Sequence, residues 1–205
     1  MNKPAGLLVD EEVVPLAARA LAPPGGRAWP RVVHRLDKGT SGCLIFALRK
    51  ASEQALLQAF DEGLVSKTYL ALVQGKPPSR ASLDTPYGPE ARDKRRFTTK
   101  LSTPRRARLS YEVVERFSNA AFLRVKLDTG RTHQIRVQLA ESGYPVLGDE
   151  TYGVPFAGLS RQGLHAFRIS LPPDVACEAP LPEDLTAVIE KLRRATAEAC
   201  PKSSS

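Results

Sequence analysis

A carboxylate set among basic side chains, just before a glycine turn, is the part of this sequence best suited to chemistry. Asp37 lies between Arg35 and Lys38, with His34 three residues upstream and Gly-Thr-Ser-Gly at 39–42. The glycines permit backbone conformations that other residues avoid, and a carboxylate can form and release a covalent adduct. The simpler interpretation is a turn-forming aspartate paired with a neighbouring base.

Residues 34–42, His-Arg-Leu-Asp-Lys-Gly-Thr-Ser-Gly, resemble the catalytic motif of the RluA-type pseudouridine synthases, in which the aspartate is the essential nucleophile. Other stretches resemble the same family in the same order, and together they cover residues 2–193. These are Lys-Pro-Ala-Gly at 3–6, the Lys-x-Tyr that ends at Tyr69, Gly-Arg-Thr-His-Gln-Ile-Arg at 130–136, the segment 143–153, Leu-His-Ala at 164–166, and the segment 179–185. Gln138 and Tyr144 depart from the pattern, because histidines are expected there.

The resemblance implies an enzyme that isomerises specific uridines to pseudouridine in structured RNA, either ribosomal or transfer RNA. Asp37 would be the nucleophile, Tyr69 would stack against the extruded base and hold or move a proton, and Arg131 would pair with Asp37. A nearby guanidinium favours the ionised carboxylate. Taken alone, Tyr69 could be a tyrosine packed in a sheet, and Arg131 could hold a loop carboxylate. Attack on the sugar, attack on the base and a glycal route all remain open.

Basic residues are concentrated in one segment of the chain. The formal net charge is +8, and residues 92–108 contain eight Lys or Arg against Asp93 alone. An RNA partner is the direct inference, since neutralised phosphates release counterions, although a solvated basic loop would look the same. We expect Arg95 and Arg96 to bind phosphates, and Arg35 to replace the flipped base in the RNA. His34 and Lys3 are further candidate substrate contacts.

Composition limits the remaining possibilities. The three cysteines and three histidines lack the spacing of a disulfide framework or a metal site, and no apolar run is long enough for a membrane span. We therefore expect a cytoplasmic, monomeric protein that needs no metal or other cofactor. An inactive RNA-binding protein on the same fold is one alternative, but it would be expected to have lost part of the site. A phosphotransfer enzyme with an aspartate nucleophile is another, but it would need magnesium ligands.

The hydrophobic pattern predicts an α+β fold: a mixed, mainly antiparallel sheet with flanking helices and an RNA-binding cleft. We expect one catalytic domain over residues 1–196 and a disordered tail over 197–205. No S4-like domain is expected before it, since the first motif lies at the start of the chain. The predicted strands are 2–9, 43–48, 65–74, 107–117, 121–128 and 161–171; the predicted helices are 11–22, 51–62, 132–143 and one from about 182; the predicted loops are 23–30 and 76–105.

Overall fold

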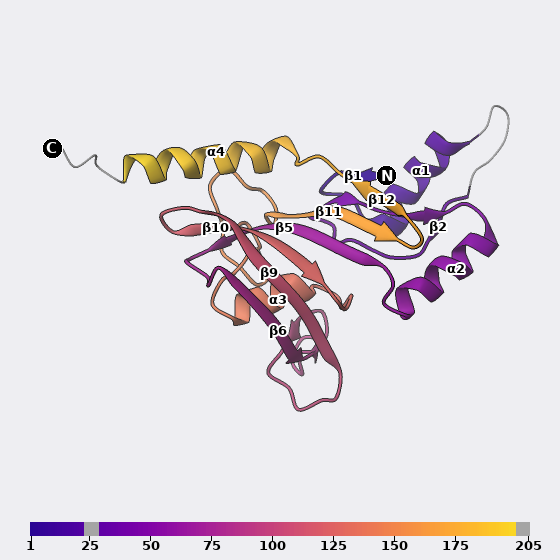
Figure 1. The fold of residues 1–205 in the computed structure, drawn as a ribbon, viewed down its shortest axis with the longest axis horizontal. Coiled ribbons are helices and arrows are strands. Elements are labelled where there is room, and N and C mark those ends of the chain that lie inside the picture. The colour runs from indigo at the N-terminus through magenta and orange to yellow at the C-terminus, as the bar shows by residue number, and fades with distance from the viewer. Residues whose placement is uncertain (23–28, 200–205) are drawn as a thin grey trace.

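A mixed, mainly antiparallel sheet forms the centre of the structure, a computed structural model that describes residues 1–22 and 29–199 (Figure 1). Its strands follow the order β1 (Asn2–Lys3), β3 (Ser41–Cys43), β11 (Leu164–Leu171), β5 (Ser66–Gln74), β10 (Ala120–Leu127), β9 (Arg106–Arg116) and β6 (Arg80–Pro86), and β12 (Val175–Glu178) pairs with β11. Two small sheets stand apart, β2 (Arg31–Val32) with β4 (Phe46–Ala47), and β7 (Gly88–Pro89) with β8 (Phe97–Thr98). The predicted α+β class is confirmed.

The long antiparallel strands supply most of the core. In β10, Leu123, Val125 and Leu127 are buried while Arg124 and Lys126 are exposed. This is the period-two pattern of a strand with one wet face, as the sequence predicts. The buried face of β10 packs with residues of β5, β9 and the helix α3 (Gln134–Glu141).

The parallel pairing of β3 with β11 brings the Asp37 segment to the middle of the molecule. Gly42 in β3 has a φ of 116°, and a Cβ placed there would lie 2.2 Å from the carbonyl oxygen of Ala166 in β11. Only glycine fits this close approach without moving the backbone. The Gly-Thr-Ser-Gly turn therefore ties the loop that carries Asp37 to a central strand.

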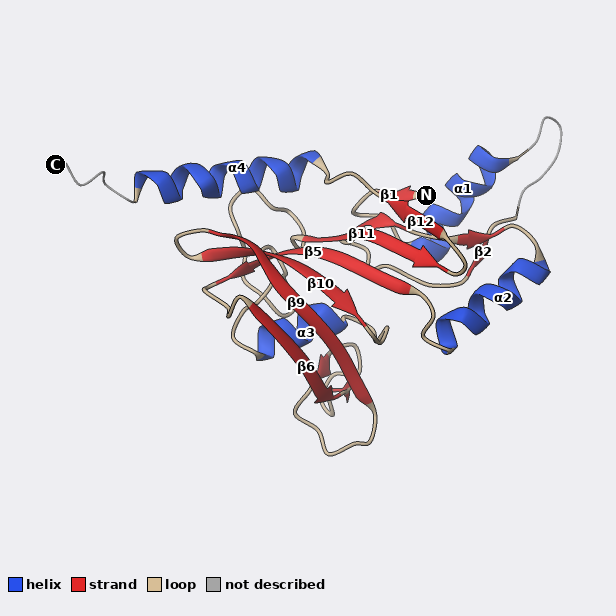
Figure 2. Cartoon of the chain, viewed as in Figure 1, coloured by secondary structure: helices blue, strands red, loops and turns tan. Residues whose placement is uncertain are grey.

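Four helices complete the described part of the fold (Figure 2). A π-helical turn, η1 (Val9–Val13), leads into α1 (Val14–Leu21), and α2 (Lys50–Asp61) lies at the end of the molecule away from α4 (Glu183–Glu198). The short helix α3 is different, because its residues from Gln134 to Leu139 are all buried. It lies against β10 and β9 and carries polar side chains into the interior.

Two predictions about the strands are wrong. The apolar run 43–48 is not one strand, because it is divided between β3 and β4, which belong to different sheets. The stretch 76–105 is not a single long loop, because β6 pairs with β9 through seven residues and β7 pairs with β8. Pro86 is tolerated since β6 is the edge strand of the central sheet.

The ends of the predicted elements also shift. The first strand is β1 alone, since the chain becomes helical from Val9. The predicted helix 11–22 is present as η1 and α1, and α4 continues to Glu198, so the predicted tail begins too early. Positions 23–28 of the predicted loop 23–30, and residues 200–205 of the tail, lie outside the described residues.

Candidate active site

Asp37 opens onto a cavity of about 1740 Å³ that is lined by residues from distant parts of the chain. Tyr69 on β5, Arg131 and His133 in the loop after β10, and Arg136 on α3 all contribute to its wall. The structure thus places Asp37, Tyr69 and Arg131 around one cavity, and their roles in catalysis stay predictions. The contacts within the cleft differ from the prediction.

The loop that carries Asp37 is held by its backbone. The carbonyl oxygen of Lys38 accepts hydrogen bonds from the Gly6 N–H at 2.8 Å and from Lys3 Nζ at 3.2 Å. The carbonyl oxygen of Gly39 accepts one from Arg161 Nη1 at 3.1 Å. These bonds fix the residues after Asp37, so its carboxylate is presented from a rigid turn and its side chain is 24% exposed.

Arg136 joins Asp37 to a second carboxylate. Its Nη1 donates to Asp37 Oδ2 at 3.0 Å, while Nε and Nη2 donate to the two oxygens of Asp149 at 2.7 and 2.8 Å. The side chain of Asp149 is only 1% exposed and that of Arg136 only 7%. A buried charge of this kind persists only when it is paired and hydrogen-bonded. Burial alone would lower the pKa of Arg136, but the hydrogen bonds and charge of Asp149, with the charge of Asp37, raise that pKa above its ordinary value.

The predicted pair between Asp37 and Arg131 is wrong. Arg131 is exposed, and its Nε donates to the carbonyl oxygen of Arg106 at 3.3 Å. The reason is the start of the helix: α3 begins at Gln134 instead of near Thr132, so Arg131 stays in the loop and Arg136 enters the buried first turn. The available signal was that Arg136 lies in the same matched segment as Arg131, between the apolar Ile135 and Val137. A buried arginine at that position needs partners.

Gln134 defines this helix start in place of the predicted cap at Thr132. Its Oε1 accepts hydrogen bonds from the Arg131 N–H at 3.0 Å and from the Thr129 hydroxyl at 2.7 Å. Its Nε2 donates to Gln138 Oε1 at 3.1 Å, and Gln138 in turn donates to Thr85 Oγ1 and to the carbonyl oxygen of Ala107. Gln138, which departs from the family pattern, therefore belongs to a buried hydrogen-bond network; it does not line the cavity itself, but its partner Gln134 does.

The other departure, Tyr144, has a similar structural role. It is half-buried and packs against the main hydrophobic core, and it is absent from the cavity lining. Neither Gln138 nor Tyr144 lines the cavity around Asp37.

Tyr69 lies on β5 opposite Val125 of β10 and lines the cavity. Burial, followed by the charge of Asp37, raises the pKa of its phenol above the ordinary value. The hydroxyl therefore stays protonated at neutral pH. It can donate a hydrogen bond, and its ring offers an aromatic surface beside Asp37.

Two predicted substrate contacts, His34 and Lys3, make hydrogen bonds to the backbone of the protein. His34 Nε2 accepts the Ile45 N–H at 3.0 Å, and its ring packs on Phe60. Burial lowers the pKa of His34 to about 4, so its ring is neutral at physiological pH. Lys3 is completely buried with its ammonium on the carbonyl oxygens of Pro4 and Lys38, and burial lowers its pKa to about 8. Lys3 has no exposed surface and is absent from the cavity lining, so its side chain is not placed to contact RNA. His34 lines the cavity that Asp37 faces, and its role in binding RNA stays a prediction.

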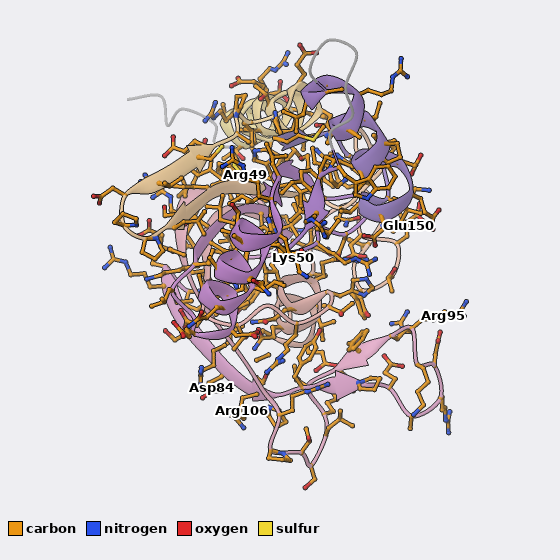
Figure 3. The ribbon with its side chains drawn as sticks, turned by 90° about the vertical axis from the view of Figure 1, so that its right-hand side faces the viewer. Arg49, Lys50, Asp84, Arg95, Arg106 and Glu150 are labelled. Atoms are coloured by element: carbon orange, nitrogen blue, oxygen red, sulfur yellow. The ribbon has the colours of Figure 1, made fainter. Side chains whose placement is uncertain are left out.

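Arg35, Arg95 and Arg96 do reach the surface. Arg35 is exposed at the cavity rim, with its Nε 3.5 Å from Asp10 Oδ2. Arg95 and Arg96 lie on a projection that we call the basic arm (residues 87–105), which contains β7 and β8. In Figure 3, Arg95 lies at the outer end of this arm, directed away from the body of the molecule.

The basic arm is attached to the body near the cavity. Thr98 Oγ1 donates to Glu141 Oε1 at 2.6 Å, and the Phe97 N–H donates to Tyr152 Oη at 3.0 Å. The guanidinium of Arg96 lies 5.1 Å from the centre of the Tyr152 ring, and that of Arg136 lies 5.2 Å from the same ring. One tyrosine thus contacts both the arm and the arginine that holds Asp37.

His133 and Tyr152 are site residues that the sequence prediction missed. His133 Nε2 lies 3.9 Å from Asp37 Oδ1, and His133 Nδ1 lies 3.1 Å from Tyr152 Oη. Both residues fall within the segments that resemble the family, 130–136 and 143–153, which was the available signal. The left-handed backbone of His133, with φ at 57°, gives no signal in the residue types.

Within residues 1–22 and 29–199, no three His, Cys, Asp or Glu side chains are grouped so that they could hold a metal ion. In the same residues, no helix has the length and apolar character needed to cross a membrane.

Comparison with known proteins agrees with this geometry. Residues 1–141 match the family model described as RNA pseudouridylate synthase. An uncharacterized RNA pseudouridine synthase from Chloroflexus aurantiacus is 39% identical over 94% of this chain and 66% of its own length. The ribosomal large subunit pseudouridine synthase D of Nitrosomonas europaea is 35% identical over 79% of this chain and 51% of its own length. The chain thus spans between half and two thirds of these relatives.

Solved structures show the same fold. Human RNA pseudouridylate synthase domain containing 1 superposes with a TM-score of 0.76 and 28% identity, covering 94% of this chain and 89% of that one. Human RNA pseudouridylate synthase domain containing 4 gives a TM-score of 0.79 at 24% identity, covering 94% and 88%. The resemblance of residues 34–42 is confirmed across most of the chain, which belongs to the RNA pseudouridylate synthase family and is of the RluA type.

Proposed function

We propose that this protein converts uridine to pseudouridine in RNA, with Asp37 as the nucleophile. The observation that carries the proposal is the chain of Asp149, Arg136 and Asp37 at the cavity wall. It orients one carboxylate in a cavity large enough for a nucleotide.

The reaction breaks the bond between the base nitrogen and the anomeric carbon, turns the base and rejoins it through carbon. A carboxylate can form a transient covalent adduct in such a sequence. Because Arg136 is occupied by Asp149 on two of its nitrogens, the third is directed at Asp37 and fixes the carboxylate oxygen that it contacts. The opposite oxygen, Oδ1, is then turned toward the cavity and His133.

Base flipping supplies the substrate to this site. Removing a base from its stack costs a few kcal/mol, and Arg35 at the cavity rim is placed to take the position that the base leaves. Its planar guanidinium can stack between bases. Tyr69 then offers its ring to the extruded uracil, and its phenol remains a hydrogen-bond donor.

The basic arm is the proposed phosphate-binding surface. Arg95 and Arg96 already pair with Asp93 and Glu90 at 3.1 and 3.2 Å, so RNA phosphates would replace these carboxylates. Large-subunit ribosomal RNA is the first substrate to test, since relatives such as the Nitrosomonas europaea protein are named for it. Transfer RNA is the second.

Chemical mapping of pseudouridine tests the proposal. Ribosomal and transfer RNA from cells with and without the gene are compared, and the purified full-length protein is then incubated with the unmodified RNA. We expect one or more sites to disappear with the gene and to be restored by wild-type protein. Asp37→Asn, which is nearly isosteric, should restore none while binding the RNA with nearly unchanged affinity. Modification by Asp37→Asn at the wild-type rate excludes Asp37 as the nucleophile. If the pseudouridine map is the same with and without the gene and the wild-type protein modifies no RNA, the proposed activity is excluded and the alternative of an inactive RNA-binding protein is favoured.

A further inference from the structure

His133 occupies an unusual position beside the nucleophile. It is the only residue other than glycine with a positive φ among residues 1–22 and 29–199. Left-handed backbone is uncommon for residues other than glycine, although histidine adopts it more often than most, and such residues cluster at functional sites. This conformation places the imidazole directly before α3, between Asp37 and Tyr152.

The hydrogen bonds of Tyr152 indicate which ring nitrogen of His133 carries the proton. Tyr152 Oη accepts the Phe97 N–H at 3.0 Å, and within the described residues His133 Nδ1 is the one acceptor in reach of its own proton. His133 Nδ1 lies 3.1 Å from that oxygen, and a neutral imidazole has one donor nitrogen and one acceptor nitrogen. With Nδ1 accepting from the phenol, the proton of the ring lies on Nε2.

His133 Nε2 faces Asp37 but makes no hydrogen bond to it. The distance of 3.9 Å to Asp37 Oδ1 is too long for a hydrogen bond, and Nε2 has no other hydrogen-bond partner within the described residues. His133 also lines the cavity, with its side chain 24% exposed. A donor therefore points into the cavity beside the carboxylate oxygen that Arg136 leaves uncovered.

The ring is also neutral at physiological pH. Burial lowers the pKa of His133 below its ordinary value; the charge of Asp37 opposes this shift and the charge of Arg136 adds to it. A neutral ring with its proton on Nε2 can donate a hydrogen bond without adding a positive charge that would compete with Arg136 for Asp37.

We propose that His133 is a catalytic residue that donates a hydrogen bond from Nε2 to a ribose or uracil oxygen of the nucleotide at Asp37, and that Tyr152 is the positioning residue that fixes its tautomer. This role rests on the proposed function. It also connects the reaction centre to the basic arm, because Tyr152 Oη accepts the Phe97 N–H of the arm and contacts His133 Nδ1.

Two substitutions test the roles of His133 and Tyr152 separately. His133→Asn keeps a residue type that tolerates the left-handed backbone but is too short to reach the cavity with a donor. We expect kcat to fall about 100-fold, as for loss of one preorganised donor, with KM for RNA nearly unchanged. Tyr152→Phe keeps the ring against Arg96 and Arg136 and removes only the hydroxyl, so we expect a smaller fall, about 10-fold. Tyr144→Phe, outside the cavity lining, is the matched control and should leave kcat unchanged.

Nitrogen NMR of histidine-labelled protein reads the tautomer without RNA or turnover. The chain has three histidines, so the His133 ring can be assigned by substitution. We expect Nδ1 unprotonated and Nε2 protonated in the wild type at neutral pH, and a mixture of tautomers in Tyr152→Phe. A proton on Nδ1 in the wild type overturns the role of Tyr152, and wild-type kcat in His133→Asn overturns the role of His133. If the wild-type protein makes no pseudouridine at all, the proposed function fails instead, and the catalytic role of His133 fails with it.

Discussion

Arg136 Nη1 lies 3.0 Å from Asp37 Oδ2, although 99 residues separate the two in the chain. The other two nitrogens of Arg136 that donate hydrogen bonds both contact Asp149, so Asp149 fixes the orientation of the guanidinium that binds Asp37. A planar group with several fixed donors can do this, whereas an ammonium is a single point of charge. The orientation of the proposed nucleophile is therefore set by an interaction that spans half of the fold.

Substituting lysine for each of two arginines tests which one serves Asp37. Arg136→Lys keeps the charge but cannot contact both carboxylates with the same geometry, so kcat should fall by about 100-fold or more. Arg131→Lys is the matched control and should keep nearly full kcat, because Arg131 is exposed and bonds only to the backbone of Arg106 through its side chain. Single-turnover rates with saturating enzyme measure the effect apart from RNA binding.

Thermal unfolding of both variants shows whether any loss is a folding defect. Equal loss of turnover in two well-folded variants would show that Arg131 also contributes to the reaction. That result would contradict the assignment of Arg136 as the partner of Asp37.

The lowered pKa of His34 predicts how the stability of the folded protein depends on pH. The folded protein lowers the pKa of this ring to about 4 from the ordinary 6.5, through burial first. The unfolded chain then binds more protons than the folded one between these values, so stability falls as pH drops through this window. The shift corresponds to a loss on the order of 3 kcal/mol by pH 4.

Denaturant unfolding at pH 7, 5.5 and 4 measures this loss, with His34→Gln as the comparison. Glutamine can still accept the Ile45 N–H but does not titrate. His133 and His165 also have lowered pKa values and contribute equally to both proteins, so the difference in pH slope isolates His34. Parallel slopes for the two proteins would show that His34 does not resist protonation.

The sequence was sufficient for the long strands but not for the connections. Alternation over 121–128 predicts β10 because each side chain's environment is set by one face of one sheet. The run 43–48 looks like one strand by the same rule, yet Cys43 and Phe46 pair in different sheets. Which neighbour a strand meets is a tertiary property, and the residue types of the strand do not record it.

The partner of Asp37 could not be chosen from the motif for a similar reason. Arg131 and Arg136 both lie in the matched segment, and a shift of two residues in the helix start decides which one is buried. Gln134 sets that start through hydrogen bonds to Thr129 and Arg131, and the left-handed turn at His133 completes it. Neither feature follows from helix propensity.

The basic arm predicts a salt-dependent contribution to RNA affinity. Arg95→Gln and Arg96→Gln should each weaken binding and reduce the slope of log affinity against log salt by about 0.7 to 0.9 for each phosphate that the variant no longer neutralises. Arg168→Gln, an exposed arginine paired with Glu178 on the β11–β12 hairpin, is the control and should leave the slope unchanged. Arg96→Gln should in addition lower kcat, since Arg96 alone of the two lies on the Tyr152 ring. A slope that stays at the wild-type value in both arm variants excludes the arm from the interface.

The proposed role of Arg35 predicts that the effect of its substitution on kcat/KM depends on the structure of the RNA. If Arg35 fills the space of the flipped base, Arg35→Ala removes the group that offsets the unstacking cost of a few kcal/mol. That cost is present when the target uridine is stacked in a hairpin and is small in an unstructured oligonucleotide with the same neighbouring bases. We therefore expect kcat/KM to fall about 10 to 100-fold on the hairpin, as a loss of about one to three kcal/mol of stabilisation would give, and far less on the unstructured RNA. Arg49→Ala, a change of the same charge outside the cavity lining, should affect both RNAs alike. Equal loss on both RNAs in Arg35→Ala would assign Arg35 to phosphate binding, because binding to a phosphate does not depend on whether the base is stacked.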